Sequence, residues 1–126
     1  MLTGIGVDIA EIARFERMLE RFQDRIARRI LTANEFSQFL HRKRSCAFLA
    51  LRFAAKEAAS KALGCGMSGG IGFHSIEVIN DASGKPELVF HGAAQKLISQ
   101  NNISRSMLSL SDEKHYAVAM VVLESA

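Results

Sequence analysis

The chain has 126 residues, 48% of them apolar and 23% charged, with a net charge of +3, which suits one globular domain with one hydrophobic core. One proline and nine glycines exclude collagen-like and proline-rich chains, two cysteines are too few for a disulfide scaffold, and no apolar run is long enough to span a membrane. We therefore expect a single domain over residues 1–126, located in the cytoplasm and without a membrane partner.

The first predicted element is a strand over residues 2–9, in which three aliphatic residues alternate with Gly4, Gly6 and Asp8. The alternation places Asp8 on the face opposite the aliphatic side chains. Because the two glycines have no side chains, we expect this face to be open to the approach of a bulky group.

An amphipathic helix is predicted next, from Glu11 to about Ile26, because the period of the apolar residues changes from two to about 3.6. Its apolar stripe consists of Ile12, Phe15, Leu19, Phe22 and Ile26. If the helix is continuous, a second stripe forms an exposed row of guanidinium groups with one methionine among them: Arg14, Met18, Arg21, Arg25 and Arg28.

The middle of the chain has the start and stop signals of two further helices. Thr32 and Glu35 form a capping box that begins a short helix, and a basic turn over residues 41–44 follows it. A longer helix is predicted over about residues 47–63, which are rich in strong helix formers, and Gly64 stands at its expected end. Small alanines along this helix would allow it to pack closely against a sheet.

The second half of the chain changes to strands and turns. The predicted order is a strand at 75–80, a turn at 81–86, a strand at 87–91, a helix at 93–99, and strands at 107–111 and 116–124. Strands joined as hairpins, with most helices grouped elsewhere, predict an α+β domain with antiparallel sheet.

Three charged residues form a candidate site for phosphate and a divalent cation. Glu57 and Lys61 are four residues apart, so they share one face of the long helix. Glu57 and Asp8 would supply carboxylate oxygens to Mg²⁺, an ion that keeps several waters, and Lys61 would neutralise a phosphate oxygen. The alternatives are a helix-stabilising ion pair and a solvated aspartate, and the spacing alone does not show that Asp8 and Glu57 meet.

Sequence motifs for three other kinds of site are absent or stand in the wrong structural context. Residues 64–69 fit G-x-G-x-x-G but follow a helix instead of a strand, which excludes a dinucleotide-binding motif. The four histidines lack the spacing of zinc ligands, and no serine has the partners of a catalytic triad.

The basic residues are concentrated in one part of the chain. Residues 14–61 contain 12 basic and five acidic residues, whereas the remainder contains four basic and eight acidic ones. This distribution favours an anionic partner, although a solvated helix face without a partner is the alternative. A nucleic-acid-binding domain is disfavoured, because acidic residues interrupt the arginine row and the chain has no tryptophan and one tyrosine for base stacking.

Four blocks of the sequence, in this order, resemble the 4′-phosphopantetheinyl transferases in their small bacterial branch, the holo-[acyl-carrier-protein] synthases. They are residues 4–12 with Arg14, residues 52–61, residues 84–86 and residues 116–119. The resemblance implies the fold of that superfamily over the whole chain. It also implies transfer of phosphopantetheine from coenzyme A to a serine of apo acyl carrier protein in fatty acid biosynthesis, with release of adenosine 3′,5′-bisphosphate.

The resemblance also implies roles for individual residues. Asp8 and Glu57 match the Mg²⁺ ligands of the family, and Lys61 matches the lysine that neutralises the β-phosphate. The positions that match residues near the nucleotide are Lys43, Arg52, Gly64, Lys85 and Pro86. The positions that match the helix that holds the acidic carrier protein are Arg14, Met18, Arg21 and Arg25.

Two further expectations come from the resemblance. Related enzymes are trimers with active sites between subunits, so a homotrimer is expected. Many relatives have a histidine where this chain has Ser111 and Asp112, which leaves the general base open among Glu57, a metal-bound water and Asp112.

Overall fold

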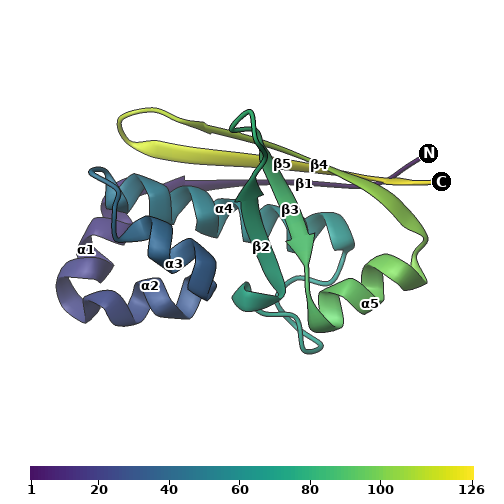
Figure 1. Ribbon diagram of the computed structural model, residues 1–126, viewed down its shortest axis with the longest axis horizontal. Coiled ribbons are helices and arrows are strands. Elements are labelled where there is room, and N and C mark those ends of the chain that lie inside the picture. The colour runs from purple at the N-terminus through teal and green to yellow at the C-terminus, as the bar shows by residue number, and fades with distance from the viewer.

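The computed structural model describes residues 1–126 as two antiparallel sheets and five α-helices, which confirms the predicted α+β class (Figure 1). In chain order the elements are β1 (Leu2–Glu11), α1 (Ile12–Phe22), α2 (Asp24–Ile30), α3 (Ala33–Phe39), α4 (Ser45–Leu63), a 3₁₀ turn (Phe73–Ser75), β2 (Ile76–Asn80), β3 (Pro86–Phe90), α5 (Gly92–Gln100), β4 (Ile103–Asp112) and β5 (Tyr116–Ser125). None of the helices combines the length and the apolar character needed to cross a membrane.

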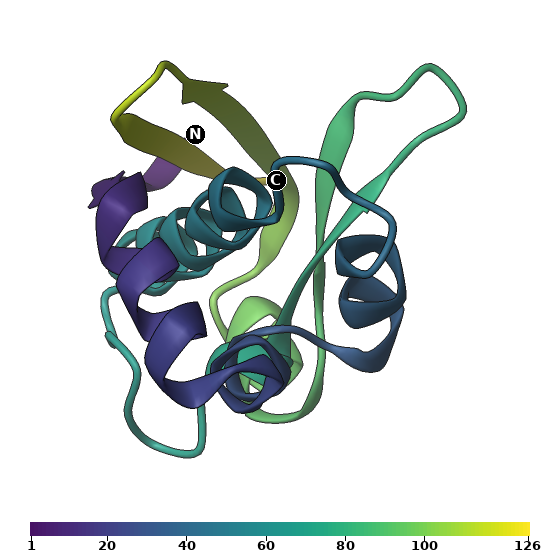
Figure 2. The same cartoon turned by 90° about the vertical axis from the view of Figure 1, so that its left-hand side faces the viewer.

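The larger sheet has the strand order β1-β5-β4, and β2 and β3 form a separate hairpin. The three long strands lie together along one side of the molecule, and α4 runs beneath them (Figure 1). Seen along α4, the α1–α2 pair lies on one side of this helix and the β2–β3 hairpin on the other (Figure 2). The long helix is therefore the element on which the rest of the fold is assembled.

The face of β1 that is exposed to solvent is the aliphatic one, whereas the sequence predicted that the glycine face would be open. Ile5, Val7 and Ile9 point outward and are 67%, 58% and 62% exposed, whereas Gly4 and Gly6 face α4. A Cβ atom added at Gly6 would collide with the carbonyl oxygen of Ala58. The prediction of an open glycine face was wrong, because alternation groups the residues of a face without saying which face a helix covers.

The close packing predicted for α4 is confirmed. Ala54, Ala55, Ala58 and Ala59 are fully buried, and backbone atoms of α4 lie against the glycines of β1. The helix ends as predicted at Gly64, whose φ of 80° lies in the left-handed region that favours glycine.

The helix predicted to run unbroken from Glu11 to Ile26 is two helices. The chain turns at Gln23, which has a φ of 55°, and the Gln23 N–H donates to the carbonyl oxygen of Leu19 at 2.8 Å. The break leaves Phe22 exposed at the elbow instead of buried in the apolar stripe. The row of arginines is accordingly divided between α1 and α2. The prediction of one continuous helix was wrong, because the period of the apolar residues contains no signal for this turn.

Candidate active site

Asp8 and Lys61 meet across the contact between β1 and α4. The Lys61 Nζ atom lies 2.9 Å from Asp8 Oδ1 and 3.0 Å from the carbonyl oxygen of Val7. The lysine therefore pairs with the aspartate of the strand and not with Glu57 of its own helix, which was the alternative that the spacing left open. The Asp8 side chain is largely buried, while that of Lys61 is half exposed.

Glu57 lies one helical turn before Lys61 and is half-buried. Burial raises the pKa of its carboxyl group, and the negative charge of Asp8 raises it further, against the opposing effect of Lys61 and Arg14. The two carboxylates are thus close enough to repel each other, with two cations beside them. The fold thus brings Asp8 into direct contact with Lys61, one helical turn from Glu57 on the same helix.

The donor set of this site suits Mg²⁺ better than a metal that proteins enclose completely. Both candidate ligands are carboxylates, and no group of three or more histidine, cysteine, aspartate or glutamate residues is placed to hold a metal. Mg²⁺ prefers oxygen ligands and retains several waters, so two carboxylates together with phosphate oxygens can suffice for it. The residues present fit that ion.

The candidate partner-binding residues line the side of α1 and the elbow to α2. Arg14 stacks over the rings of Phe15 and Phe53, with its guanidinium carbon 5.6 and 5.4 Å from their centres, and Met18 packs against the core. Arg21 and Arg25 both lie over the ring of Phe22, at 5.1 and 6.0 Å. A shallow hollow of about 370 Å³ adjoins them, lined by Phe22, Arg25, Ile26 and Arg29.

Arg52 has an environment that its position in the motif did not predict. It is 5% exposed, lies 4.5 Å above the Phe48 ring, and its buried Nε atom has no hydrogen-bond partner. Burial lowers its pKa, and the charge of Arg42, which lies 5.0 Å from the same ring, lowers it further, against the opposing effect of Glu35. Two neighbouring cations without an ion-pair partner favour an anionic ligand beside the exposed turn that holds Lys43.

The remaining candidates for nucleotide binding lie on other elements. Lys85 and Pro86 line a polar groove of about 420 Å³ between β3 and β4, together with Arg105, which the sequence did not single out. None of Asp8, Glu57 and Lys61 lines this groove. Gly64 is exposed at the end of α4. A single copy of the chain therefore does not bring all the candidates into one cavity.

Asp112, a candidate general base, is separated from Asp8 by an intervening strand. Asp8 pairs with Ala119 of β5, whereas Asp112 pairs with Ala117 at the far edge of that strand. Its Oδ2 atom forms an ion pair with Arg44 Nη1 at 3.5 Å.

The model of the 4′-phosphopantetheinyl transferase superfamily matches residues 4–121 of the chain. The chain belongs to that superfamily. The holo-[acyl-carrier-protein] synthase of Vibrio cholerae is 52% identical to it over 124 residues, which cover 98% of each protein. That of Halorhodospira halophila is 51% identical over 123 residues, with the same coverage.

Solved structures of the superfamily agree with this membership. The holo-[acyl-carrier-protein] synthase of Neisseria meningitidis is similar with a TM-score of 0.93 and 42% identity, over 99% of this chain and all of that one. The Bacillus anthracis synthase, solved in complex with CoA (3′,5′-ADP), is similar with a TM-score of 0.83 and 44% identity, over 100% and 99% of the two chains. The prediction of an enzyme, a phosphopantetheinyl transferase, is confirmed.

One residue of the motif in this phosphopantetheinyl transferase has a role that spacing did not predict. Lys56 is fully buried and forms an ion pair with Glu35 of the capping box. The capping box located Glu35 correctly, and both of its hydrogen bonds are present. The partner on α4 had no signal in the sequence, because the two residues meet only in the folded chain.

Proposed function

We propose that this chain transfers the 4′-phosphopantetheine group from coenzyme A to a serine of apo acyl carrier protein, in a Mg²⁺-dependent reaction that releases adenosine 3′,5′-bisphosphate. The observation that carries the proposal is the cluster formed by Asp8, Glu57 and Lys61, in which two carboxylates repel each other and a lysine lies 2.9 Å from one of them. The 52% identity to a holo-[acyl-carrier-protein] synthase supports the same reaction. So does the complex of the Helicobacter pylori synthase, 29% identical to this chain, with coenzyme A.

Asp8 and Glu57 would hold the Mg²⁺ ion. When bound, the ion supplies positive charge to the pyrophosphate of coenzyme A. Lys61, half exposed beside Asp8, contributes a second positive charge toward the β-phosphate. Displacement at phosphorus requires alignment of the groups and neutralisation of charge more than covalent chemistry from the protein. These residues neutralise the charge.

The serine hydroxyl of the carrier protein attacks the β-phosphorus, the bond to adenosine 3′,5′-bisphosphate breaks, and the serine proton must be accepted nearby. Glu57 is the candidate for this role at the proposed metal site, where it would accept the proton directly or through a water held by the ion. Asp112 is less suited, because it is paired with Arg44 on the other side of β5. We therefore assign proton acceptance to Glu57.

Two groups of residues would bind the nucleotide half of coenzyme A. Arg52 offers a buried guanidinium without an ion-pair partner, over the same Phe48 ring as Arg42, and the exposed Lys43 follows Arg42 in the basic turn. Lys85 and Pro86 line the polar groove between β3 and β4, and the exposed Gly64 leaves room at the end of α4. A phosphate-rich ligand complements the positive charge of these surfaces.

The acyl carrier protein would bind to α1 and the elbow. Arg14, Arg21 and Arg25 take part in no ion pair within the chain, so their charge is available to an acidic partner. Met18 and the hollow beside Phe22 provide apolar contact between them. This combination suits an acidic helix with apolar side chains.

We further propose a homotrimer in the cytoplasm. The outer face of the larger sheet exposes Ile5, Val7, Ile9 and Met120 to solvent, which is an unusual cost for an isolated chain. Covering this face with further copies would bring the separate candidate regions of neighbouring chains together. Active sites between subunits would then explain why one chain distributes its nucleotide-binding candidates over several elements.

The decisive experiment incubates the protein with apo acyl carrier protein, coenzyme A and Mg²⁺, and follows the carrier protein by mass spectrometry. We expect a mass gain of one phosphopantetheine that chelation of the metal prevents. The Asp8→Ala variant should fold normally and lose this activity. Modification at the normal rate by this variant would refute the assignment of the metal ligands, and no modification by the wild-type protein would refute the function.

A further inference from the structure

Lys56, the residue before the candidate ligand Glu57, is the fully buried lysine of α4. Its Nζ atom donates to the carbonyl oxygens of Ile30 at 2.7 Å and Phe73 at 2.9 Å and forms an ion pair with Glu35. The three acceptors belong to the end of α2, the 3₁₀ turn and α3. All three donor positions of the ammonium group are therefore satisfied, and each acceptor lies on a different element.

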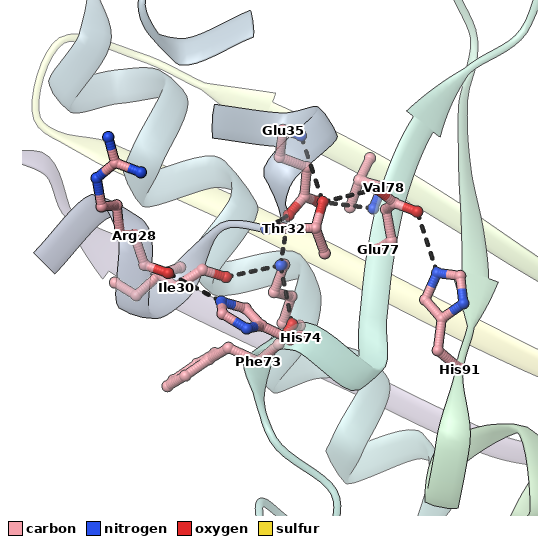
Figure 3. Close-up of polar contacts among 10 residues, drawn as sticks. Arg28, Ile30, Thr32, Glu35, Phe73, His74, Glu77, Val78 and His91 are labelled. Carbon is pink, nitrogen blue, oxygen red and sulfur yellow. Dashed lines mark hydrogen bonds and ion pairs between the residues drawn. The ribbon is translucent and has the colours of Figure 1, made fainter. Parts of the chain in front are cut away.

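Glu35 connects the same point to the rest of the fold. Besides the lysine, its two carboxylate oxygens accept from the N–H groups of Thr32 at 2.9 Å and Val78 at 2.8 Å. Thr32 in turn donates through its hydroxyl to Glu77 of β2 at 2.6 Å. Figure 3 shows Thr32, Glu35 and Glu77 meeting between α3 and the β2 strand. The position of the Lys56 ammonium group is thus determined by four elements at once.

The side of α4 that packs against β1 has no long side chains that interlock with the strand. From Ala54 to its end, the fully buried side chains of the helix are alanines and one serine, apart from Lys56. Side chains this small permit the backbone of β1 to approach, but they form no deep ridges that interlock with the strand. In the half of the helix that carries Glu57 and Lys61, Lys56 is the one long buried side chain.

We propose that the buried pair of Lys56 and Glu35 is a positioning device for the active site, which sets the axial rotation of α4 and thereby holds Glu57 at the correct distance from Asp8. The inference rests on the proposed function of Asp8 and Glu57 as metal ligands. Neither Lys56 nor Glu35 contacts a substrate. Their effect reaches the reaction through the helix that they anchor.

The test compares the wild-type protein with the variant Glu35→Gln/Lys56→Met, in which no unpaired charge remains buried. Ile76→Ala is the matched control, because Ile76 is a fully buried residue of β2 whose side chain makes no polar contact in this network. Glu35→Gln alone serves as a second variant, which leaves the Lys56 charge buried without its anionic partner. Mg²⁺ is titrated calorimetrically into each protein saturated with coenzyme A, and the Tm and the KM for the carrier protein are measured in parallel.

We expect the double variant to bind Mg²⁺ about tenfold more weakly, with the KM for the carrier protein changed less than about twofold. Glu35→Gln should shift Mg²⁺ binding in the same direction and lower the Tm further than the double variant does, and Ile76→Ala should lower the Tm and retain the wild-type affinity for Mg²⁺. Wild-type affinity in both network variants, or an equal loss of affinity in Ile76→Ala, would overturn the proposal. Mg²⁺ binding is measured without the carrier protein, so absence of transfer by the wild-type protein would refute the proposed function alone.

Discussion

The basic residues of one motif on α4 have three different environments. Arg52 is buried without an anionic partner, Lys56 is buried in an ion pair, and Lys61 is half exposed beside Asp8. Burial of a cation is costly unless it is paired, so Lys56 has a structural role, while Arg52 is suited to an external anion. At the scale of single residues, the partner of each cation decides its role.

The pH dependence of stability should reveal one carboxylate of the buried network. Burial alone would raise the pKa of Glu77, but hydrogen bonds from Thr32 and His91, together with the charges of His91 and Lys56, bring it below its usual 4.5. The unfolded chain then binds this proton more readily, so the contribution of Glu77 to stability is present above pH 4.5 and is lost as the pH falls through the lower folded pKa.

We therefore expect Glu77→Gln to reduce the loss of stability between pH 5 and pH 3. The measurement is urea denaturation of both proteins at several pH values across this window. An unchanged pH dependence in the variant would show that Glu77 has no lowered pKa in the folded protein.

At the scale of elements, the contact of β1 with α4 fixes the candidate site. Gly4 and Gly6 leave the strand without side chains at the points where the carbonyl oxygens of Ala62 and Ala58 lie. Asp8 follows on the same face and so reaches the edge of the helix that carries Glu57 and Lys61. The geometry of the charged residues depends on the absence of side chains beside them.

Gly6→Ala should therefore destabilise the protein by about 3 kcal/mol, since the added methyl group must push the strand and helix backbones apart. Gly72→Ala is the matched control, because Gly72 has a φ of −130° and no atom near its missing Cβ. Denaturation by urea measures both variants. Equal stability of the two would contradict the close backbone contact.

The arginines of α1 allow a second prediction at this scale. Arg21→Glu should weaken binding of the carrier protein by roughly tenfold and leave coenzyme A binding nearly unchanged, because Arg21 has no acidic partner within the chain. Arg17→Glu is the control on the same helix, since Arg17 is paired with Glu11 at 3.2 Å. Titration calorimetry with each ligand distinguishes the cases, and equal losses for both ligands would argue against docking on α1.

At the scale of the whole molecule, one broad face of the larger sheet is not covered by any helix. The helices lie on the other side of the three long strands (Figure 1), and the β2–β3 hairpin stands beside β4. The aliphatic side chains of β1 are therefore left in solvent in a single copy. Burying them against further copies would recover roughly 25 cal/mol for each Å² of apolar surface removed from water.

Ile5→Glu should accordingly convert the proposed trimer to monomers and abolish transfer activity, because a charge would be buried in each interface. Light scattering after size-exclusion chromatography would report a mass near 13.8 kDa for the variant and three times this value for the wild-type protein. A trimeric variant with normal activity would place the interface elsewhere.

The fold class and most elements could be predicted from the sequence, because period, caps and turn residues act locally. The capping box at Thr32 and the end of α4 at Gly64 are examples. The elbow at Gln23 could not be predicted, since a glutamine with positive φ is held by its surroundings and not by its own preference.

The candidate residues of the site could be named from the sequence, but their arrangement in space could not. Asp8 and Glu57 were identified by residue type and by family resemblance, but their approach depends on a helix packing against a strand about fifty positions away. The burial of Arg52 and the pairing of Lys56 with Glu35 depend on the same tertiary arrangement. Local patterns contain no record of which distant residue will become a neighbour.

The backbone contact at Gly6 has a consequence for how this sequence can diverge. Any residue larger than glycine would displace the stretch of helix at Ala58, and Glu57 is the residue immediately before it. A substitution of Gly6 would therefore also change the spacing of Asp8 and Glu57. Such a substitution would be tolerated only together with a compensating change in the helix. Gly6, which has no side chain and takes no part in the chemistry, is therefore strongly restricted in the residues that can replace it.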